Sequence, residues 1–180
     1  MGGMLTLVLG GARSGKSRYA QSLCFGRRVV FLATARDESD GEWRERIARH
    51  RADRPPTWRT LEAPVDLAGA LAAVGEGETA LVDCLSLWVS NLMDEQRDCA
   101  PDVLEARVLG EVERTIDAVA GRDTVIVSNE VGSATVPEHL VARRFRDLLG
   151  FANQAVARRA DRVVLLVAGL PIVLKDGGGR

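Results

Sequence analysis

A glycine-rich segment near the start of the chain constrains the fold more than any other feature. A short apolar run, residues 5–9, precedes it, and a helix-compatible run, residues 17–24, follows it. Glycines at a strand-to-helix turn let the backbone wrap around phosphate oxygens, and the first helical N–H groups add positive potential. The segment matches the complete motif G-x-x-x-x-G-K-[S/T] and predicts a P-loop that binds nucleotide phosphates through Gly10, Gly11, Ala12, Arg13, Ser14, Gly15, Lys16 and Ser17.

The P-loop motif also predicts a magnesium site beside the bound phosphates. Of 24 basic residues only Lys16 and Lys175 are lysines, so the chain retains lysine where a slim, compact charge suits the β- and γ-phosphates. Ser17 is expected to ligate Mg²⁺. Asp83 follows the apolar run 80–82 and is the expected second ligand, because ligands gather at the carboxyl ends of strands. Two alternatives are open: Asp83 could cap a following helix, and Glu130 could supply the carboxylate.

Short apolar runs alternate with helical patterns along the chain. The runs 5–9, 29–33, 80–82, 125–127 and 163–167 are too short for helices and are mostly rich in Val, Ile or Leu, which suits strands buried on both faces of a sheet. Amphipathic spacing predicts helices over 103–120 and 138–160 and a shorter one around 67–74. We expect an α/β fold of the P-loop NTPase type, with a mostly parallel, doubly wound sheet in a single domain over 1–180.

Composition excludes several classes of protein. The chain is 46% hydrophobic and 27% charged with a net charge of -1, which is typical of a globular domain and gives no basic excess for nucleic acid. Cys24, Cys84 and Cys99 are widely spaced and contain no C-x-x-C pair, so neither a disulfide framework nor a zinc site is predicted. We expect a reduced, cytoplasmic setting and no membrane span.

The chain contains two histidines, and the first lies in an unusual setting. Trp43, Ile47 and His50 share one face of a helix by their spacing, and arginines surround the imidazole in sequence. The spacing alone favours a half-buried structural histidine. The alternative is a nucleophile that attacks phosphorus while arginines stabilise the developing charge. The surrounding arginines are Arg46, Arg49, Arg51 and Arg54; His139, at a predicted helix start, is interpreted as structural.

Several further motifs occur in order over nearly the whole chain. In them the sequence resembles the bifunctional adenosylcobinamide kinase / adenosylcobinamide-phosphate guanylyltransferases of cobalamin biosynthesis, and the set is much more specific than a lone P-loop. Besides the P-loop, the matching pieces are Ala33-Thr34-Ala35, Arg46-Ile47 with His50, Arg54-Pro55 with Trp58-Arg59-Thr60, Glu62, Val89-Ser90-Asn91-Leu92, Ser128-Asn129-Glu130-Val131-Gly132 with Val136-Pro137-Glu138, and Ala142-Arg143 with Phe145-Arg146-Asp147.

The resemblance implies a homotrimeric enzyme with two steps. First, a γ-phosphoryl group moves from ATP or GTP to the aminopropanol hydroxyl of adenosylcobinamide. Second, the histidine matching His50 takes GMP from GTP as a phosphoramidate, and adenosylcobinamide phosphate then accepts GMP to give adenosylcobinamide-GDP. Beyond the P-loop, the nucleotide contacts that it carries over are Thr34, Ala35, Arg36, Arg51, Ala52, Asp53, Arg54, Glu62 and Asp83.

Two other functions compete with this hypothesis. One is a P-loop small-molecule kinase without guanylyl transfer. The other is a regulatory GTPase, whose N-K-x-D guanine motif is missing because lysine occurs only at 16 and 175. The chain also departs from some relatives of the enzyme at Arg49, where they carry a second histidine, so no helper imidazole is expected there.

Overall fold

A seven-stranded sheet forms the centre of the computed structural model, which describes residues 2–36, 54–133 and 135–177. The strand order is β3-β2-β4-β5-β1-β6-β7, and every neighbouring pair is parallel except β6 and β7. The strands are β1 (Leu5–Gly10), β2 (Val29–Ala33), β3 (Arg59–Glu62), β4 (Thr79–Asp83), β5 (Thr124–Asn129), β6 (Arg162–Val167) and β7 (Leu170–Lys175).

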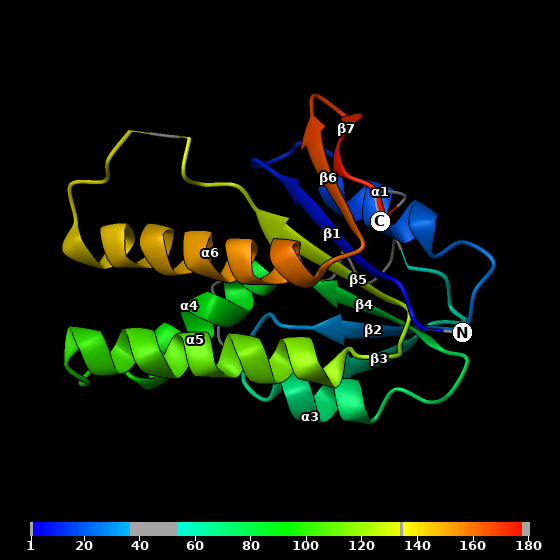
Figure 1. Ribbon diagram of the computed structural model, residues 1–180, viewed down its shortest axis with the longest axis horizontal. Coiled ribbons are helices and arrows are strands. Elements are labelled where there is room, and N and C mark those ends of the chain that lie inside the picture. The colour runs from blue at the N-terminus through cyan, green and yellow to red at the C-terminus, as the bar shows by residue number, and fades with distance from the viewer. Residues whose placement is uncertain (1, 37–53, 134, 178–180) are drawn as a thin grey trace.

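Helices cover both faces of this sheet, and they do so unequally. Four of them, α3 to α6, pack on one face, and α1 lies on the other (Figure 1). The predicted α/β class with a mostly parallel, doubly wound sheet is confirmed. The helices are α1 (Lys16–Leu23), α3 (Leu67–Ala72), α4 (Leu85–Glu95), α5 (Pro101–Ala118) and α6 (Leu140–Arg159).

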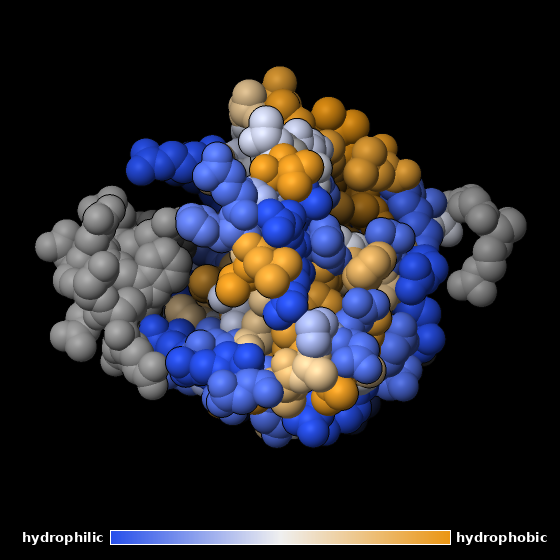
Figure 2. Space-filling model, turned by 90° about the vertical axis from the view of Figure 1, so that its left-hand side faces the viewer, coloured by the Kyte–Doolittle hydropathy of each residue, from blue (hydrophilic) through white to orange (hydrophobic). Residues whose placement is uncertain are grey.

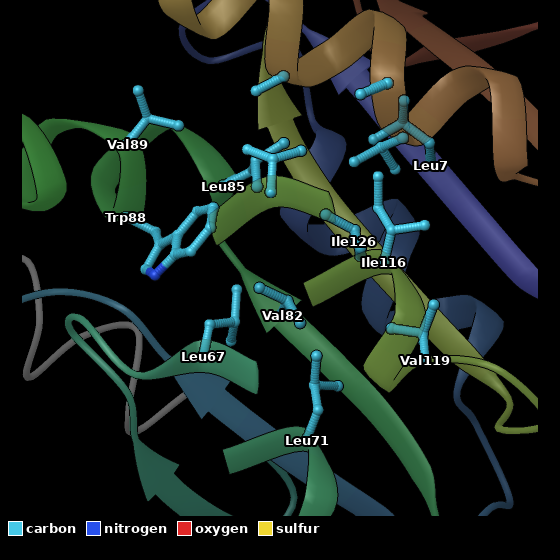
Figure 3. Packing of buried hydrophobic residues seen from close by; sticks show 14 of the residues in the cluster. Leu7, Leu67, Leu71, Val82, Leu85, Trp88, Val89, Ile116, Val119 and Ile126 are labelled. Atoms are coloured by element: carbon cyan, nitrogen blue, oxygen red, sulfur yellow. The ribbon is translucent and has the colours of Figure 1, made fainter. Parts of the chain in front are cut away.

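The larger hydrophobic core lies between the sheet and α3 to α6. Strand side chains such as Val82 and Ile126 are fully buried there. They pack in one cluster with Leu71 of α3, Trp88 of α4 and Ile116 of α5 (Figure 3). Burying side chains of this size stabilises the fold by roughly 1.5–3 kcal/mol each. This core fixes the relative positions of the strands and therefore of the loops that follow them.

All five predicted strands are present, and the predicted helices, including the run 17–24 after the P-loop, agree with α1, α3, α5 and α6 to within a few residues. Among the described residues, two strands and one helix, α4, are additional. β3 was not predicted because its four residues are mostly exposed, and β7 was not predicted because every one of its residues is exposed. α4 was expected only as a helix that Asp83 could cap; Cys84 occupies the N-cap position instead, and Asp83 ends β4.

The parallel strands bring distant parts of the sequence to one edge of the sheet. In Figure 1 the arrowheads of β1, β2, β4 and β5 all point toward the same side of the molecule. Residues that directly follow these strands therefore face one region, as expected for ligand sites in open α/β sheets. In spatial order along this edge lie Glu62 at the end of β3, residues 34–36 after β2, Asp83 at the end of β4, Glu130 after β5 and the P-loop at the end of β1.

Candidate active site at the P-loop edge

The P-loop is tightly packed at its first residue and open further on. A Cβ atom on Gly10 would lie 2.3 Å from Ser14 Oγ and 2.9 Å from the carbonyl oxygen of Leu166, so only glycine fits there. Gly11, Ala12, Arg13 and Gly15 are exposed. Gly15 is the N-cap of α1 and no side chain caps that helix. Exposed N–H groups at an uncapped helix N-terminus suit the binding of phosphate.

Two neighbouring segments hold the P-loop in place. The backbone N–H of Glu130 donates to the carbonyl of Gly10 over 3.1 Å, and that of Gly169 donates to the carbonyl of Ser14 over 3.0 Å. The second contact comes from the turn between β6 and β7, which the sequence analysis did not connect with the site. A turn at Ala168-Gly169 could be expected from the sequence. Its contact with the P-loop could not, because a local sequence pattern does not show what a hairpin packs against.

Lys16 and Ser17 occupy the first turn of α1, and both are half-buried. Lys16 Nζ donates to the carbonyl oxygen of Gly11 over 3.1 Å, which folds its ammonium group back over the loop. This arrangement puts a positive charge where the P-loop would hold phosphate oxygens.

The end of β4 lies within electrostatic reach of the P-loop. Burial raises the pKa of the Cys84 thiol, the neighbouring Asp83 carboxylate adds to the rise, and Lys16 opposes it. The Asp83 carboxylate, the predicted metal ligand, and the Lys16 ammonium group of the P-loop therefore both act electrostatically on the Cys84 thiol. Cys84 Sγ lies 3.0 Å from Ser86 Oγ.

The donor set at this edge fits Mg²⁺ bound together with a nucleotide. Ser17 offers a hydroxyl and Asp83 a carboxylate, which are hard oxygen ligands. Among residues 2–36, 54–133 and 135–177 there is no group of three or more acidic, histidine or cysteine side chains that could hold a metal ion. Mg²⁺ in nucleotide sites is usually held by one or two side chains, substrate phosphates and water, so this sparse set is suitable.

Thr34, predicted as a nucleotide contact, is fully buried in this structure. Its hydroxyl donates to the carbonyl of Cys84 and accepts from the Cys84 N–H, each over 2.8 Å. Arg36 pairs with Asp94 over 3.2 Å and with Glu95 over 2.6 Å at the end of α4. These contacts show what the two residues do in the protein alone; their contacts with nucleotide stay predictions.

The remaining predicted contacts lie farther from the P-loop. Glu62 is exposed at the end of β3 and is paired in register with Ala33 of β2. It therefore lies beside residues 34–36, on the side away from the P-loop. The guanidinium carbon of Arg54 lies 3.5 Å from the ring centroid of Phe31, a residue of the cluster on the α1 face. His50, Arg51, Ala52 and Asp53, together with Arg46 and Arg49, lie outside the described residues.

Glu130, the alternative metal carboxylate, is engaged locally. Its Oε1 accepts the N–H of Gly132 over 2.6 Å. The sequence analysis assigned no role to two asparagines that also act at this edge, Asn91 on α4 and Asn153 on α6. Asn91 donates to the carbonyl of Thr34, just beyond β2, and Asn153 donates to the carbonyl of Asn129, the last residue of β5. In each case the sequence signal for such a role was a single asparagine on a largely apolar helix face.

Similarity to known proteins agrees with this geometry. The chain is 46% identical over 178 residues to the bifunctional adenosylcobalamin biosynthesis protein CobP of Pseudomonas aeruginosa, covering 96% of this chain and 98% of that one. It is 38% identical to the corresponding protein CobU of Escherichia coli K12, covering 96% of this chain and all of that one.

A solved ATPase of a bacterial type III secretion system shares the fold alone. Its TM-score is 0.57 at 12% identity, over 94% of this chain and 56% of that chain. The likeness confirms the P-loop NTPase-type architecture. The model of the family described as cobinamide kinase / cobinamide phosphate guanyltransferase matches residues 6–174. With this match and two nearly full-length relatives, the chain belongs to the cobinamide kinase / cobinamide phosphate guanyltransferase family.

Proposed function

We propose that this chain catalyses both reactions in its family's name, on adenosylcobinamide and on adenosylcobinamide phosphate. The observation that carries the proposal is the family match over residues 6–174, which includes a P-loop with an uncapped helix behind it. In the first reaction the substrate hydroxyl attacks the γ-phosphorus of ATP or GTP, a new P–O bond forms, and the nucleoside diphosphate leaves. Positioning and electrostatic stabilisation supply most of the catalysis in such transfers.

The P-loop residues have distinct parts in this step. Backbone N–H groups from Gly11 to Ser17 would bind the β- and γ-phosphate oxygens. Lys16 would exchange its present bond to the Gly11 carbonyl for phosphate oxygens, as a compact cation can. Ser17 and Asp83 would hold Mg²⁺, which, when bound, neutralises part of the phosphate charge.

The second reaction needs a nucleophile, and we assign this role to His50. A neutral imidazole nitrogen would attack the α-phosphorus of GTP, forming a P–N bond as the bond to pyrophosphate breaks. The phosphate of adenosylcobinamide phosphate would then attack the same phosphorus and release the imidazole. Arg51 to Arg54, Glu62 and residues 34–36 are the proposed contacts for the guanine nucleotide.

An exposed apolar strand supports the proposed homotrimer. β7 is the edge strand of the sheet, and the side chains of Leu170, Ile172, Val173 and Leu174 are 70%, 49%, 47% and 57% exposed. Hydrophobic colour gathers toward the top of Figure 2, the level at which Figure 1 places this hairpin. Exposed apolar edges are normally covered, and further copies of this chain are the proposed cover.

The proposed setting is the cytoplasm, and the proposed partners do not include nucleic acid. The three cysteines are unpaired, which suits a reducing compartment. No helix in the described part of the chain has the length and apolar character needed to cross a bilayer. The near-neutral net charge of -1 offers little attraction for a phosphate backbone.

A product assay tests the proposal. The full chain is incubated with adenosylcobinamide, Mg²⁺ and either ATP or GTP, and corrinoid products are resolved by mass spectrometry. We expect phosphorylation first and, with GTP, conversion to adenosylcobinamide-GDP. Lys16→Ala should lower the rate of phosphorylation by about 100-fold or more, since a phosphate-binding charge is lost. Lys175→Ala, which changes the other lysine, is the matched control and should phosphorylate normally.

Substitution of His50 then separates the two reactions. His50→Ala should still make adenosylcobinamide phosphate and should not make the GDP product. Wild-type protein that phosphorylates the substrate but never forms the GDP product would indicate a small-molecule kinase instead. Protein that binds GTP and modifies no corrinoid would contradict both parts of the proposal.

A further inference from the structure

Asn91 has no part in the reactions proposed above, yet it makes two long-range hydrogen bonds at the candidate site. Its Nδ2 donates to the carbonyl of Thr34 over 2.8 Å and to the carbonyl of Pro64 over 2.9 Å. The two acceptors follow β2 and β3, respectively. One side-chain amide on α4 therefore holds together the ends of two adjacent strands.

Thr34 passes this connection on to the end of β4. Its hydroxyl both donates to the Cys84 carbonyl and accepts from the Cys84 N–H over 2.8 Å, and its own N–H donates to the Asp83 carbonyl over 3.4 Å. Thr34 and Cys84 are both buried, so water does not compete for these bonds. The Thr34 hydroxyl therefore binds both the N–H and the C=O group of Cys84, the residue that follows Asp83.

The contacts form a closed ring through Cys84, the residue that directly follows Asp83. α4 begins at Leu85, directly after Cys84, and returns through Asn91 to Thr34, which binds Cys84. A second bond fixes the same helix: Trp88 Nε1 donates to the Val65 carbonyl over 2.7 Å, and the indole lies within the core (Figure 3). The Thr34–Cys84 bonds are buried and the Asn91 and Trp88 bonds are part-buried, so these contacts tie the helix to the strand end.

We propose that Asn91 is a positioning residue that, through Thr34, sets the place of the Asp83 carboxylate for magnesium. This inference rests on the proposed function, in which Ser17 and Asp83 hold Mg²⁺ with the nucleotide. Groups that orient a metal ligand without touching the metal typically change metal affinity or activity by about 10- to 100-fold when removed. Loss of Asn91 is therefore expected to weaken the coupling between Mg²⁺ and nucleotide, while the P-loop itself stays intact.

Asn153 on α6 offers a matched control. Its Nδ2 donates to the Asn129 carbonyl over 3.0 Å, and its Oδ1 accepts from Ser128 Oγ over 2.7 Å. It is 7% exposed and holds the end of β5, next to Glu130, the alternative carboxylate. The two asparagines thus make comparable bonds at the ends of different strands. Comparing them separates positioning of Asp83 from general loosening of the sheet edge.

The experiment measures binding of a fluorescent GTP analogue to the full-length protein, in EDTA and across a Mg²⁺ titration. The variants are Asn91→Leu and Asn153→Leu, which keep similar volume without donors, and Asn91→Ala, which removes the same donors without adding apolar volume. Asn91→Leu and Asn91→Ala should raise the Mg²⁺ concentration for half-maximal enhancement of binding by about 10- to 100-fold. Asn153→Leu should stay near wild type, and affinity in EDTA should not change in any of the three variants.

The outcomes separate this inference from the proposed function. Wild-type protein that fails to bind the analogue, or binds it without regard to Mg²⁺, would contradict the proposed nucleotide and metal site. Mg²⁺-dependent binding that survives Asn91→Leu, or that Asn153→Leu weakens equally, would overturn the positioning role alone. If Asn91→Leu does not fold, Asn91→Ala decides: a raised Mg²⁺ requirement with unchanged affinity in EDTA supports the inference, and a wild-type Mg²⁺ requirement refutes it.

Discussion

The N–H of Gly169 and the carbonyl of Ser14 are 3.0 Å apart and join the tip of the β6–β7 hairpin to the P-loop. A Cβ atom on Gly15 would lie 3.4 Å from the Gly169 Cα atom, so the two backbones are in close contact there. The strand pair that carries the exposed apolar edge is therefore also a support of the candidate nucleotide site. Changes in the hairpin should reach the P-loop without touching any of its residues.

The hairpin turn provides a test with two adjacent substitutions. Ala168 and Gly169 have φ values of 51° and 82°, a region that side chains with a Cβ atom rarely adopt. Gly169→Ala should lower the free energy of unfolding by about 1 kcal/mol and weaken nucleotide binding, whereas Ala168→Gly should leave stability unchanged or raise it by up to about 1 kcal/mol. Urea denaturation and fluorescent GTP-analogue binding measure the two effects. Unchanged nucleotide affinity in Gly169→Ala would show that the hairpin does not support the loop.

The exposed edge strand predicts how the proposed trimer can be dissociated. Ile172→Asp places a charge on β7 and should convert the proposed trimer to monomers, because burying an unpaired carboxylate in an interface is costly. Val141→Asp is the control, since Val141 is 68% exposed on α6, away from this strand. Size-exclusion chromatography with light scattering gives the masses. A trimer that survives Ile172→Asp, or that Val141→Asp dissociates, would place the interface elsewhere.

Lys175 has a structural role at the end of α6 that its sequence context did not indicate. Its Nζ donates to the carbonyls of Ala157 and Arg158, over 3.1 Å and 3.0 Å, in the last turn of α6. A cation at a helix C-terminus satisfies open carbonyls and complements the helix dipole. Lys175→Met should lower the free energy of unfolding by about 0.5–1 kcal/mol, and Lys175→Arg should restore part of it. Equal stability of wild type and Lys175→Met in urea would show that these bonds contribute nothing.

Local patterns were sufficient for much of the fold and for the P-loop. Runs of Val, Ile and Leu such as 29–33 can hardly be anything but buried strands once a strand-loop-helix motif precedes them. β7 was not predicted, although its sequence is as apolar as that of a core strand. All of its residues are exposed at the surface of the molecule. The exposure of β7 follows from its position at the edge of the sheet, and a local stretch of sequence does not show where a sheet ends.

Within the candidate site, the limits of sequence reasoning were contacts between distant residues. Asp83 and the P-loop could be placed at one edge because parallel strands must share it. Asn91 and Thr34 are 57 positions apart, and their bond depends on how α4 packs across the strand ends. Gly169 and Ser14 are separated still further, and they meet because β6 pairs with β1 in a register that places Leu166 opposite Gly10.

Covalent labelling by GTP tests the central claim, that His50 carries the guanylyl group between the two substrates. The wild-type chain, His50→Ala and His139→Ala are incubated with Mg²⁺ and GTP labelled at the α-phosphate, and protein-bound label is measured before and after acid treatment. Because the chain has only two histidines, His139→Ala is a complete control. We predict an acid-labile label in the wild type and in His139→Ala, and none in His50→Ala; label that persists in His50→Ala, or is absent from the wild type, would contradict the account.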